Sequence, residues 1–161
     1  TPHIVKKIDR EPIDNPNFAI PKKTTIDQKN FSPVIEAMHE VFKTGTGKWS
    51  QVKGINICGK TGTAENFIIK NGKKEQLEDH SILVAFAPKN NPKIALAVFV
   101  ENGGYGSTIA APISSLLIEK YMNGKISEQN KYRERIILEK SLENIYAKQI
   151  PKTENSATGK K

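Results

Sequence analysis

The sequence predicts an α+β fold in which three antiparallel strands are flanked by helices. Three segments have the composition of strands: residues 55–69, 81–87 and 93–101. The last two are joined by residues 88–92, a turn too short for the crossover that parallel strands need. Apolar residues at helical spacing precede and follow these strands, in residues 32–43 and 108–122.

The composition and spacing of the first 47 residues predict a short strand, a surface loop and one helix. Residues 3–8 have strand composition, and residues 9–29 contain Xaa-Pro turn signals typical of an extended loop. Ser32 is expected to cap a helix that begins at Pro33. The apolar face of this helix is expected to comprise Val34, Ile35, Met38, Val41 and Phe42. The Thr-Gly-Thr-Gly run at residues 44–47 is expected to end it.

The central part of the chain predicts the strands. Residues 55–69 begin with alternating isoleucines and are interrupted by the polar run Gly-Lys-Thr-Gly-Thr at residues 59–63. Asn71-Gly72 is a dipeptide typical of a hairpin turn. Residues 93–101 are apolar enough for a central strand of the sheet.

The residue pattern of the C-terminal part of the chain predicts a flexible loop at residues 102–107, two helices and a tail. The first helix covers residues 108–122, with Pro112 in its first turn, and stops at Asn123-Gly124. Its apolar face is expected to comprise Ile109, Ile113, Leu116, Leu117 and Tyr121. Residues 126–149 predict a more polar helix with the stripe Leu138, Leu142, Ile145 and Tyr146. Residues 151–161 have the composition of a disordered tail.

Composition excludes several classes of protein. A single cysteine rules out an internal disulfide and a cysteine-rich zinc site, and the scattered histidines do not form a metal site. The longest apolar run, residues 94–100, is far short of a membrane span. The net charge of +8 comes from lysines spread along the whole chain without interleaved aromatic residues, which favours a solvated basic surface over nucleic-acid binding.

Two motifs compete for the same residues. Gly54 to Thr61 fits the phosphate-binding pattern G-x-x-x-x-G-K-[ST], which requires a loop that opens a helix. The residues that follow have strand composition instead, so this match is expected to be accidental. Lys60-Thr61-Gly62 also fits the K-T-G motif of penicillin-binding proteins and β-lactamases.

The K-T-G reading has a physical basis on an edge strand that faces a cleft. Lys60 supplies a positive charge, while Thr61 and Thr63 present hydroxyls on one side, two residues apart. Together they can bind a substrate carboxylate through charge-assisted hydrogen bonds. Gly62 lets the substrate approach the backbone closely.

A longer series of segments around this motif is more specific than the three letters. It comprises residues 59–65, 79–81, 85–88, 91–95, 98–102 and 110–113. With these segments in this order, the chain resembles the C-terminal part of the transpeptidase domain of class B penicillin-binding proteins, and most of all the penicillin-binding protein 2 group, which serves cell elongation. The resemblance implies a partial domain with the penicillin-binding, serine β-lactamase-like sheet.

The resemblance also implies roles for individual residues. Lys60 corresponds to the family lysine that stabilises charge in the active site and the substrate carboxylate. Thr61 and Thr63 correspond to the hydroxyls that bind this carboxylate, and Gly62 to the position of close approach. The backbone N–H of Thr63 corresponds to half of the oxyanion hole, so Lys60 and Thr63 are expected to be catalytic. No cofactor and no metal are expected.

The nucleophile motifs of this family are not found in the chain. No S-x-N is present, and the one S-x-x-K is Ser50 to Lys53. We reject it, because the nucleophile must open a buried helix and Gly54 follows at once. Since the chain also begins at Thr1 rather than Met, it is expected to be an inactive piece of a longer enzyme.

The resemblance further implies a domain organisation and partners. Residues 1–124 are expected to be the C-terminal portion of the transpeptidase domain, residues 125–150 a helical extension and residues 151–161 the tail. The expected partners are peptidoglycan stem peptides, β-lactam antibiotics and membrane proteins of cell elongation, with no nucleic acid. The expected location is the periplasmic face of the bacterial inner membrane, through an N-terminal anchor. A phosphate-binding loop protein and a non-catalytic sensor of cell-wall peptides remain the alternatives.

Four further residues are expected to have structural rather than functional roles. Cys58 is expected to be a small buried strand residue. His3 and His39 are expected at the surface, and Trp49 is expected to pack against its neighbours.

Overall fold

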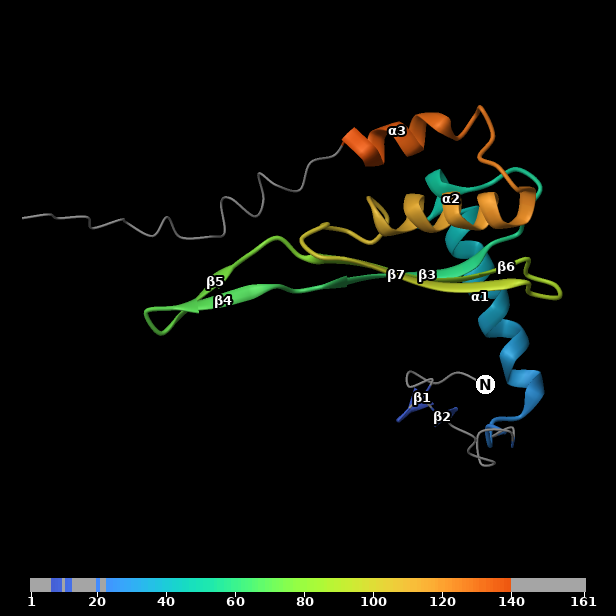
Figure 1. Cartoon of the computed structure of the whole chain (residues 1–161), viewed down its shortest axis with the longest axis horizontal. Helices are drawn as coiled ribbons and strands as arrows, with labels where there is room; N and C mark the ends of the chain where they lie inside the picture. The colour runs from blue at the N-terminus through green and yellow to red at the C-terminus, as the bar shows by residue number, and fades with distance from the viewer. Residues whose placement is uncertain (1–6, 10, 13–19, 21–22, 140–161) are drawn as a thin grey trace, which may run out of the picture. The chain divides into compact units, whose positions relative to one another are not determined.

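The structure is a computed structural model that describes residues 7–9, 11–12, 20 and 23–139 of the chain (Figure 1). The chain divides into two compact units, Thr1–Ser32 and Pro33–Lys161. Among the described residues, no helix has both the length and the apolar composition to cross a membrane.

The first unit contains a small hairpin and a 3₁₀ turn. Strands β1 (Lys7–Ile8) and β2 (Glu11–Pro12) pair antiparallel around Asp9, which has a φ of +49°. The 3₁₀ helix η2 (Gln28–Asn30) follows Asp27, whose carboxylate accepts a hydrogen bond from the Lys29 N–H. The predicted uninterrupted loop at residues 9–29 is therefore wrong at both ends. Residues 3–6 of the predicted first strand lie outside the described residues.

Three antiparallel strands form the sheet of the second unit, as predicted. They are β3 (Cys58–Ala64), β6 (His80–Ala87) and β7 (Ile94–Val100), in the order β3-β6-β7. The prediction that residues 93–101 form a central strand is wrong, because β6 is the strand that has a partner on each side. Apolar composition does not decide which strand is paired on both edges, since that depends on the neighbours that the chain brings alongside.

The first predicted strand is broken at a different place from the one expected. The polar residues 59–63 belong to β3, while Ile55 pairs with Val52 in an isolated bridge. The break falls after Ala64, before the separate hairpin of β4 (Phe67–Lys70) and β5 (Lys73–Gln76). The predicted turn at Asn71-Gly72 is confirmed, and both residues have positive φ, as a tight hairpin requires.

Helix α1 (Phe31–Lys43) begins earlier than predicted. Ser32 is its second residue rather than its cap, because the turn η2 leads directly into the helix. The helix ends where predicted, and the N–H groups of Thr44 and Gly45 both donate to the Glu40 carbonyl. Only Phe42 of its expected apolar face is buried, whereas Val34 is exposed.

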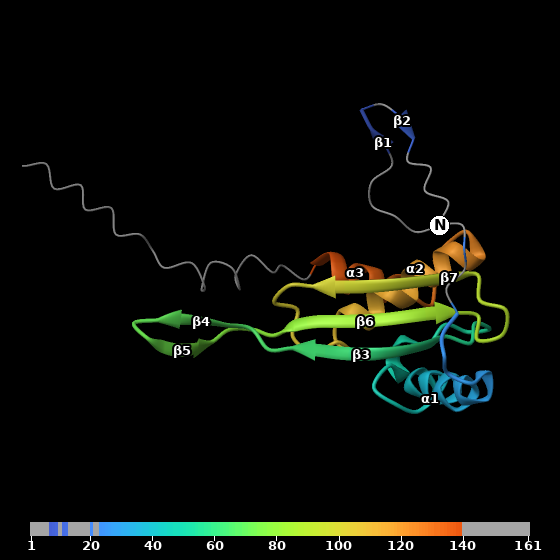
Figure 2. The same cartoon turned by 90° about the horizontal axis from the view of Figure 1, so that it is seen from below.

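Helix α2 (Ala110–Asn123) covers one face of the sheet (Figures 1 and 2). Its stop is confirmed, since Gly124 has a φ of +74°. The predicted apolar face is partly wrong, because Leu117 and Tyr121 are exposed. The buried face is made mostly of small residues, and the hydroxyls of Ser114 and Ser115 bond to backbone carbonyls one turn earlier. Small side chains let the helix lie close to the sheet.

Helix α3 (Lys131–Glu139) packs on α2 and starts later than predicted. A buried carboxylate, Glu119 of α2, accepts hydrogen bonds from the Ser127 N–H and the Asn130 side-chain amide. These bonds hold the segment before α3 in a turn, so the helix begins only at Lys131. Residues 140–149 of the predicted helix and the predicted tail lie outside the described residues.

Candidate functional site

The residues of the K-T-G motif lie on β3, which is an edge strand of the sheet as predicted. Thr61 and Thr63 pair with Leu83 and Ser81 of β6, so the two threonines share one face of the sheet. This confirms that their hydroxyls lie on one side. Lys60 pairs with Val84 and so belongs to the opposite face, away from α2.

The Lys60 side chain is exposed, and its ammonium folds back along the strand. Lys60 Nζ donates to the Thr61 carbonyl at 2.7 Å, and its side chain has no carboxylate partner among the described residues. The ammonium is therefore held at β3 by one neutral acceptor. A positive charge held in this way is available to an anionic ligand.

Thr46, in the turn after α1, contacts the K-T-G motif. The hydroxyls of Thr46 and Thr61 lie 2.9 Å apart, within hydrogen-bond distance. Sequence reasoning missed Thr46, because the two residues are fifteen positions apart and in different elements. The only sequence signal is that Thr46 stands between two glycines directly after a helix.

The N-terminal half of β3 packs against α1, which lies alongside the strand (Figure 2). A Cβ atom on Gly59 would come within 2.8 Å of the Phe42 ring and 2.7 Å of the Val84 carbonyl, so only glycine fits here. His39 is half-buried, with its ring Nδ1 3.1 Å from the Ile57 carbonyl, so the expectation of a surface position is wrong. These contacts fix β3 relative to the end of α1.

The loop between β7 and α2 supports β3 from the α2 side. Asn102, Gly103 and Gly106 are buried, so the predicted flexible loop is largely packed. A Cβ on Gly106 would overlap the carbonyl oxygens of Gly62 and Ile82, which shows that this loop rests directly on the strand backbone.

A buried serine and a histidine fasten this loop to β6. Ser81 Oγ donates to the Tyr105 carbonyl and accepts from the Ala110 N–H. At the other end of the loop, the Asn102 N–H donates to His80 Nδ1. His80 thus bonds across the fold to a residue far from it in sequence.

The alternative of a phosphate-binding loop is wrong. Gly59, Lys60 and Thr61 are paired strand residues, and the chain continues as a strand to Ala64. A phosphate-binding loop must lead into a helix, whose N-terminal N–H groups hold the phosphates. The geometry that this function needs is therefore missing.

The position of Ser50 is not that of a nucleophile, as expected. Ser50 ends the 3₁₀ helix η3 (Lys48–Ser50) and is 1% exposed, and the residues after it are not helical. Lys53 therefore does not lie one α-helical turn from it, as an S-x-x-K base must. The neighbouring Trp49 is 84% exposed, which contradicts the expectation that it packs.

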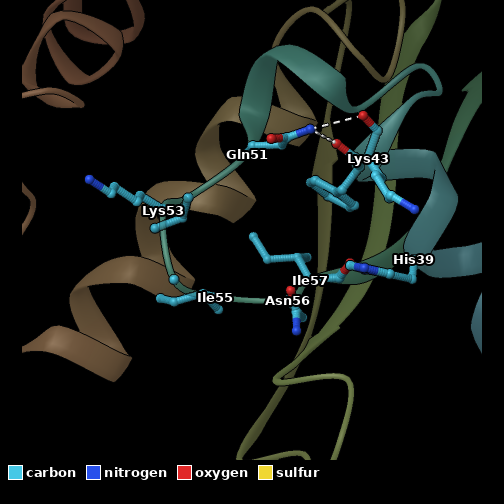
Figure 3. Close-up of a pocket in the computed structure, with 10 residues that line it drawn as sticks. His39, Lys43, Gln51, Lys53, Ile55, Asn56 and Ile57 are labelled. Atoms are coloured by element: carbon cyan, nitrogen blue, oxygen red, sulfur yellow. Dashed lines mark hydrogen bonds between the residues drawn. The ribbon is translucent and has the colours of Figure 1, made fainter.

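A cavity of about 340 Å³ lies between the end of α1 and residues 51–57 (Figure 3). Ile57 and Phe42 line it, and the Gln51 side-chain amide bonds to the Phe42 and Lys43 carbonyls beside it. The Lys43 and Lys53 ammonium groups point away from its centre (Figure 3). None of the K-T-G residues lines this cavity, so it is separate from the candidate site. The described residues contain no cluster of metal ligands.

Cys58 is fully buried, as predicted, and we expect it to be unreactive in the folded protein. Burial raises the pKa of its thiol by penalising the thiolate. Its thiol donates weakly to the Ile35 carbonyl at 3.7 Å. Alkylation followed by mass spectrometry of the Cys58 peptide should therefore show reaction only on unfolding.

The raised pKa also gives a pH dependence of stability. Below about pH 8.5 the thiol is protonated in both states and its contribution to stability is constant. Above that pH the unfolded thiol loses its proton while the folded one keeps it, so stability falls as pH rises. Cys58→Ala should remove this part of the alkaline loss. Equal alkylation rates in native and unfolded protein would contradict the prediction.

Comparisons with known proteins agree on one family. The family model of the penicillin binding protein transpeptidase domain matches residues 1–119. The peptidoglycan D,D-transpeptidase MrdA of Haemophilus influenzae is 32% identical over 155 residues, which cover 88% of this chain and 24% of the relative. The chain thus spans about a quarter of that relative's length.

Solved structures give the same result. PBP2 of Pseudomonas aeruginosa, in complex with WCK 5153, matches with a TM-score of 0.54 and 32% identity, over 80% of this chain and 27% of that one. The imipenem acyl-enzyme complex of penicillin-binding protein A from M. tuberculosis matches with a TM-score of 0.51 and 32% identity, over 63% of this chain and 21% of that one. The predicted fold class is therefore confirmed.

Proposed function

The chain belongs to the family of penicillin-binding protein transpeptidase domains, and on that premise we propose that it is the C-terminal part of a peptidoglycan D,D-transpeptidase. Residues 1–124 would complete the transpeptidase domain, residues 125–150 extend it and residues 151–161 form a tail. The observation that carries the proposal is the edge strand β3, which presents Lys60, Thr61 and Thr63 with the spacing of the family motif.

In this proposal the chain binds the substrate and the longer protein supplies the nucleophile. A serine hydroxyl attacks the D-alanyl-D-alanine carbonyl and gives its proton to a base. The C–N bond then breaks, and the terminal D-alanine leaves with that proton on its amine. An amine of a neighbouring stem peptide attacks the acyl-serine ester, forms the cross-link and regenerates the serine. A β-lactam is opened in the same way but stays on the serine.

The residues of β3 act on this chemistry in three ways. Because β3 is an edge strand, a substrate that lies along its free edge can be reached from both faces of the sheet. From one face Lys60 stabilises negative charge in the site and draws in the substrate carboxylate, which Thr61 and Thr63 bind from the other face through their hydroxyls. The Thr63 N–H contributes to the oxyanion hole, where a positioned donor stabilises the charge that develops in the transition state. Gly62 leaves room for the substrate beside the strand.

The exposed side chains on the far face of the sheet support the view that this is part of a domain. Val84 and Phe99 lie on the face away from α2 and are 45% and 55% exposed. Lys60 belongs to that same face. Apolar side chains that stay exposed together are typical of surfaces that another segment or partner covers. The remainder of a transpeptidase domain would cover this face and bring its serine toward Lys60.

Labelling with fluorescent penicillin tests the proposed function. The full-length protein that contains these residues should form a covalent adduct, whereas the isolated 161-residue chain should form none, because it carries no serine motif on a helix. An adduct on the isolated chain would contradict the assignment of the nucleophile to another segment. Absence of label on a folded full-length protein would overturn the proposal and favour the non-catalytic sensor of cell-wall peptides.

The partners and location follow from the same proposal. Stem peptides and β-lactams would bind at β3, and membrane proteins of cell elongation would bind elsewhere on the full-length protein. We place the domain on the periplasmic face of the inner membrane, held by an N-terminal anchor outside these residues.

A further inference from the structure

We propose that Thr46 is a positioning residue for carboxylate recognition: its hydroxyl donates to Thr61 and thereby turns the Thr61 proton toward the substrate carboxylate. This inference rests on the proposed function, in which Thr61 binds that carboxylate. Thr46 itself would not touch the substrate. It acts through the 2.9 Å contact between the two hydroxyl oxygens.

The chemistry of the hydroxyl groups gives this contact a direction when substrate is bound. Each threonine hydroxyl has one proton to donate and two lone pairs that accept. A carboxylate is an acceptor only, so it takes the single proton of Thr61. Thr61 can then only accept from Thr46, which gives a chain of donors from Thr46 through Thr61 to the carboxylate. Each bond in such a chain polarises and strengthens the next.

The turn that carries Thr46 is held on both sides of this residue. Gly45 N–H donates to the Glu40 carbonyl, and Gly47 N–H donates to the Val41 carbonyl at 2.8 Å. Gly47 is buried against the Phe42 ring, where a Cβ atom would come within 3.3 Å of that ring. The Thr46 hydroxyl is therefore presented to β3 by a fixed backbone.

A second set of contacts ties this turn to α3. The Gln51 side-chain amide donates to the last carbonyls of α1, those of Phe42 and Lys43, at 2.6 and 3.0 Å. Arg133 of α3 donates to the Gln51 carbonyl at 2.9 Å. The end of α1 is thus also fastened to the segment before β3 and, through it, to α3, which restricts the movement of Thr46 relative to Thr61.

Water weakens the contact before substrate binds. Thr46 is exposed, so water competes for both hydroxyls in the ligand-free site. A bound substrate displaces that water and lowers the local dielectric, which strengthens the bond. Thr46 is therefore expected to affect recognition of the carboxylate far more than stability of the fold.

The test compares variants of the full-length protein by their second-order rate of acylation by benzylpenicillin. Thr46→Val keeps the shape of the side chain but removes the hydroxyl, and should lower the rate by about three- to tenfold. Thr46→Ser keeps the hydroxyl and should restore it. Thr44→Val is the matched control, because the Thr44 hydroxyl bonds to Glu40 and not to β3. This control should acylate at the wild-type rate.

A carboxylate-free substrate separates positioning from a merely structural effect. The methyl ester of benzylpenicillin has no anionic carboxylate. It should therefore acylate the Thr46→Val variant at the same rate as the wild-type protein. In a Thr61→Val background, Thr46→Val should cause no further loss with the free acid.

Three results would overturn the inference while the proposed function stands. The first is an acylation rate of Thr46→Val with the free acid that equals the wild-type rate. The second is an equal loss of acylation rate in Thr46→Val with the acid and with the ester. The third is a loss of acylation rate in Thr44→Val as large as that in Thr46→Val. Wild-type protein that forms no adduct at all would overturn both, and the wild-type measurement alone identifies that case.

Discussion

Replacing Lys60 by alanine is expected to reduce acylation of the full-length protein by benzylpenicillin by about 100-fold or more. The ammonium of Lys60 is the positive charge that we assign to the substrate carboxylate and the reacting centre. Removing a positioned electrostatic group from an active site costs more than removing a neutral hydrogen bond. The second-order rate of acylation, followed with fluorescent penicillin, measures the loss.

The fold should survive this substitution. The Lys60 side chain is exposed and its one hydrogen bond among the described residues is to the Thr61 carbonyl, so the melting temperature is expected to change little. Lys93→Ala is a matched control, because it removes the same charge from the exposed turn between β6 and β7. It should acylate like wild type. A Lys60→Ala protein that is folded and acylated at the wild-type rate would remove Lys60 from the proposed site.

Replacing Gly106 by alanine is expected to destabilise the full-length protein by about 3 kcal/mol or more. The new Cβ would overlap two carbonyl oxygens of the sheet, those of Gly62 and Ile82, which are fixed by strand pairing. The loop would have to lift from β3, and Gly62 is part of the proposed site. Urea unfolding measures the loss of stability, and penicillin labelling should fall with it.

Gly72→Ala separates this clash from the ordinary cost of replacing a glycine. Gly72 has a φ of +73° but nothing within 4 Å of an added Cβ. Its replacement should cost about 1 kcal/mol, through backbone strain alone, and leave labelling unchanged. If Gly106→Ala costs no more than Gly72→Ala, the loop between β7 and α2 does not rest on β3 in the way described.

The prediction of the site from the sequence depended on local features. The alternation of side chains along a strand places Thr61 and Thr63 on one side whatever the rest of the fold, and the register confirms it. The absence of helix-forming residues after Thr61 excluded the phosphate-binding loop for a similar reason. Thr46 could not be found in this way, because its contact with Thr61 exists only after α1 has packed beside β3.

The errors in the fold share one physical cause. Which strand is central depends on pairing between segments, and apolar composition favoured β7 where β6 has two neighbours. Which face of α2 is buried depends on how closely the helix approaches the sheet. Small residues such as Ala111 and Ser114 allow that approach and are buried, while the larger Tyr121 is left exposed.

Local sequence patterns were enough to predict the three strands of the main sheet and their antiparallel pairing, the helices around them, the family, and the position of Lys60, Thr61 and Thr63 on one strand, but not the exact bounds of these elements. These follow from local periodicity, turn residues and motif order, which neighbouring residues encode. Local patterns could not predict the edge position of β7, the packed loop at Gly106 or the contact of Thr46 with Thr61. Each of these depends on the approach of segments distant in sequence, and packing of the whole unit sets that distance.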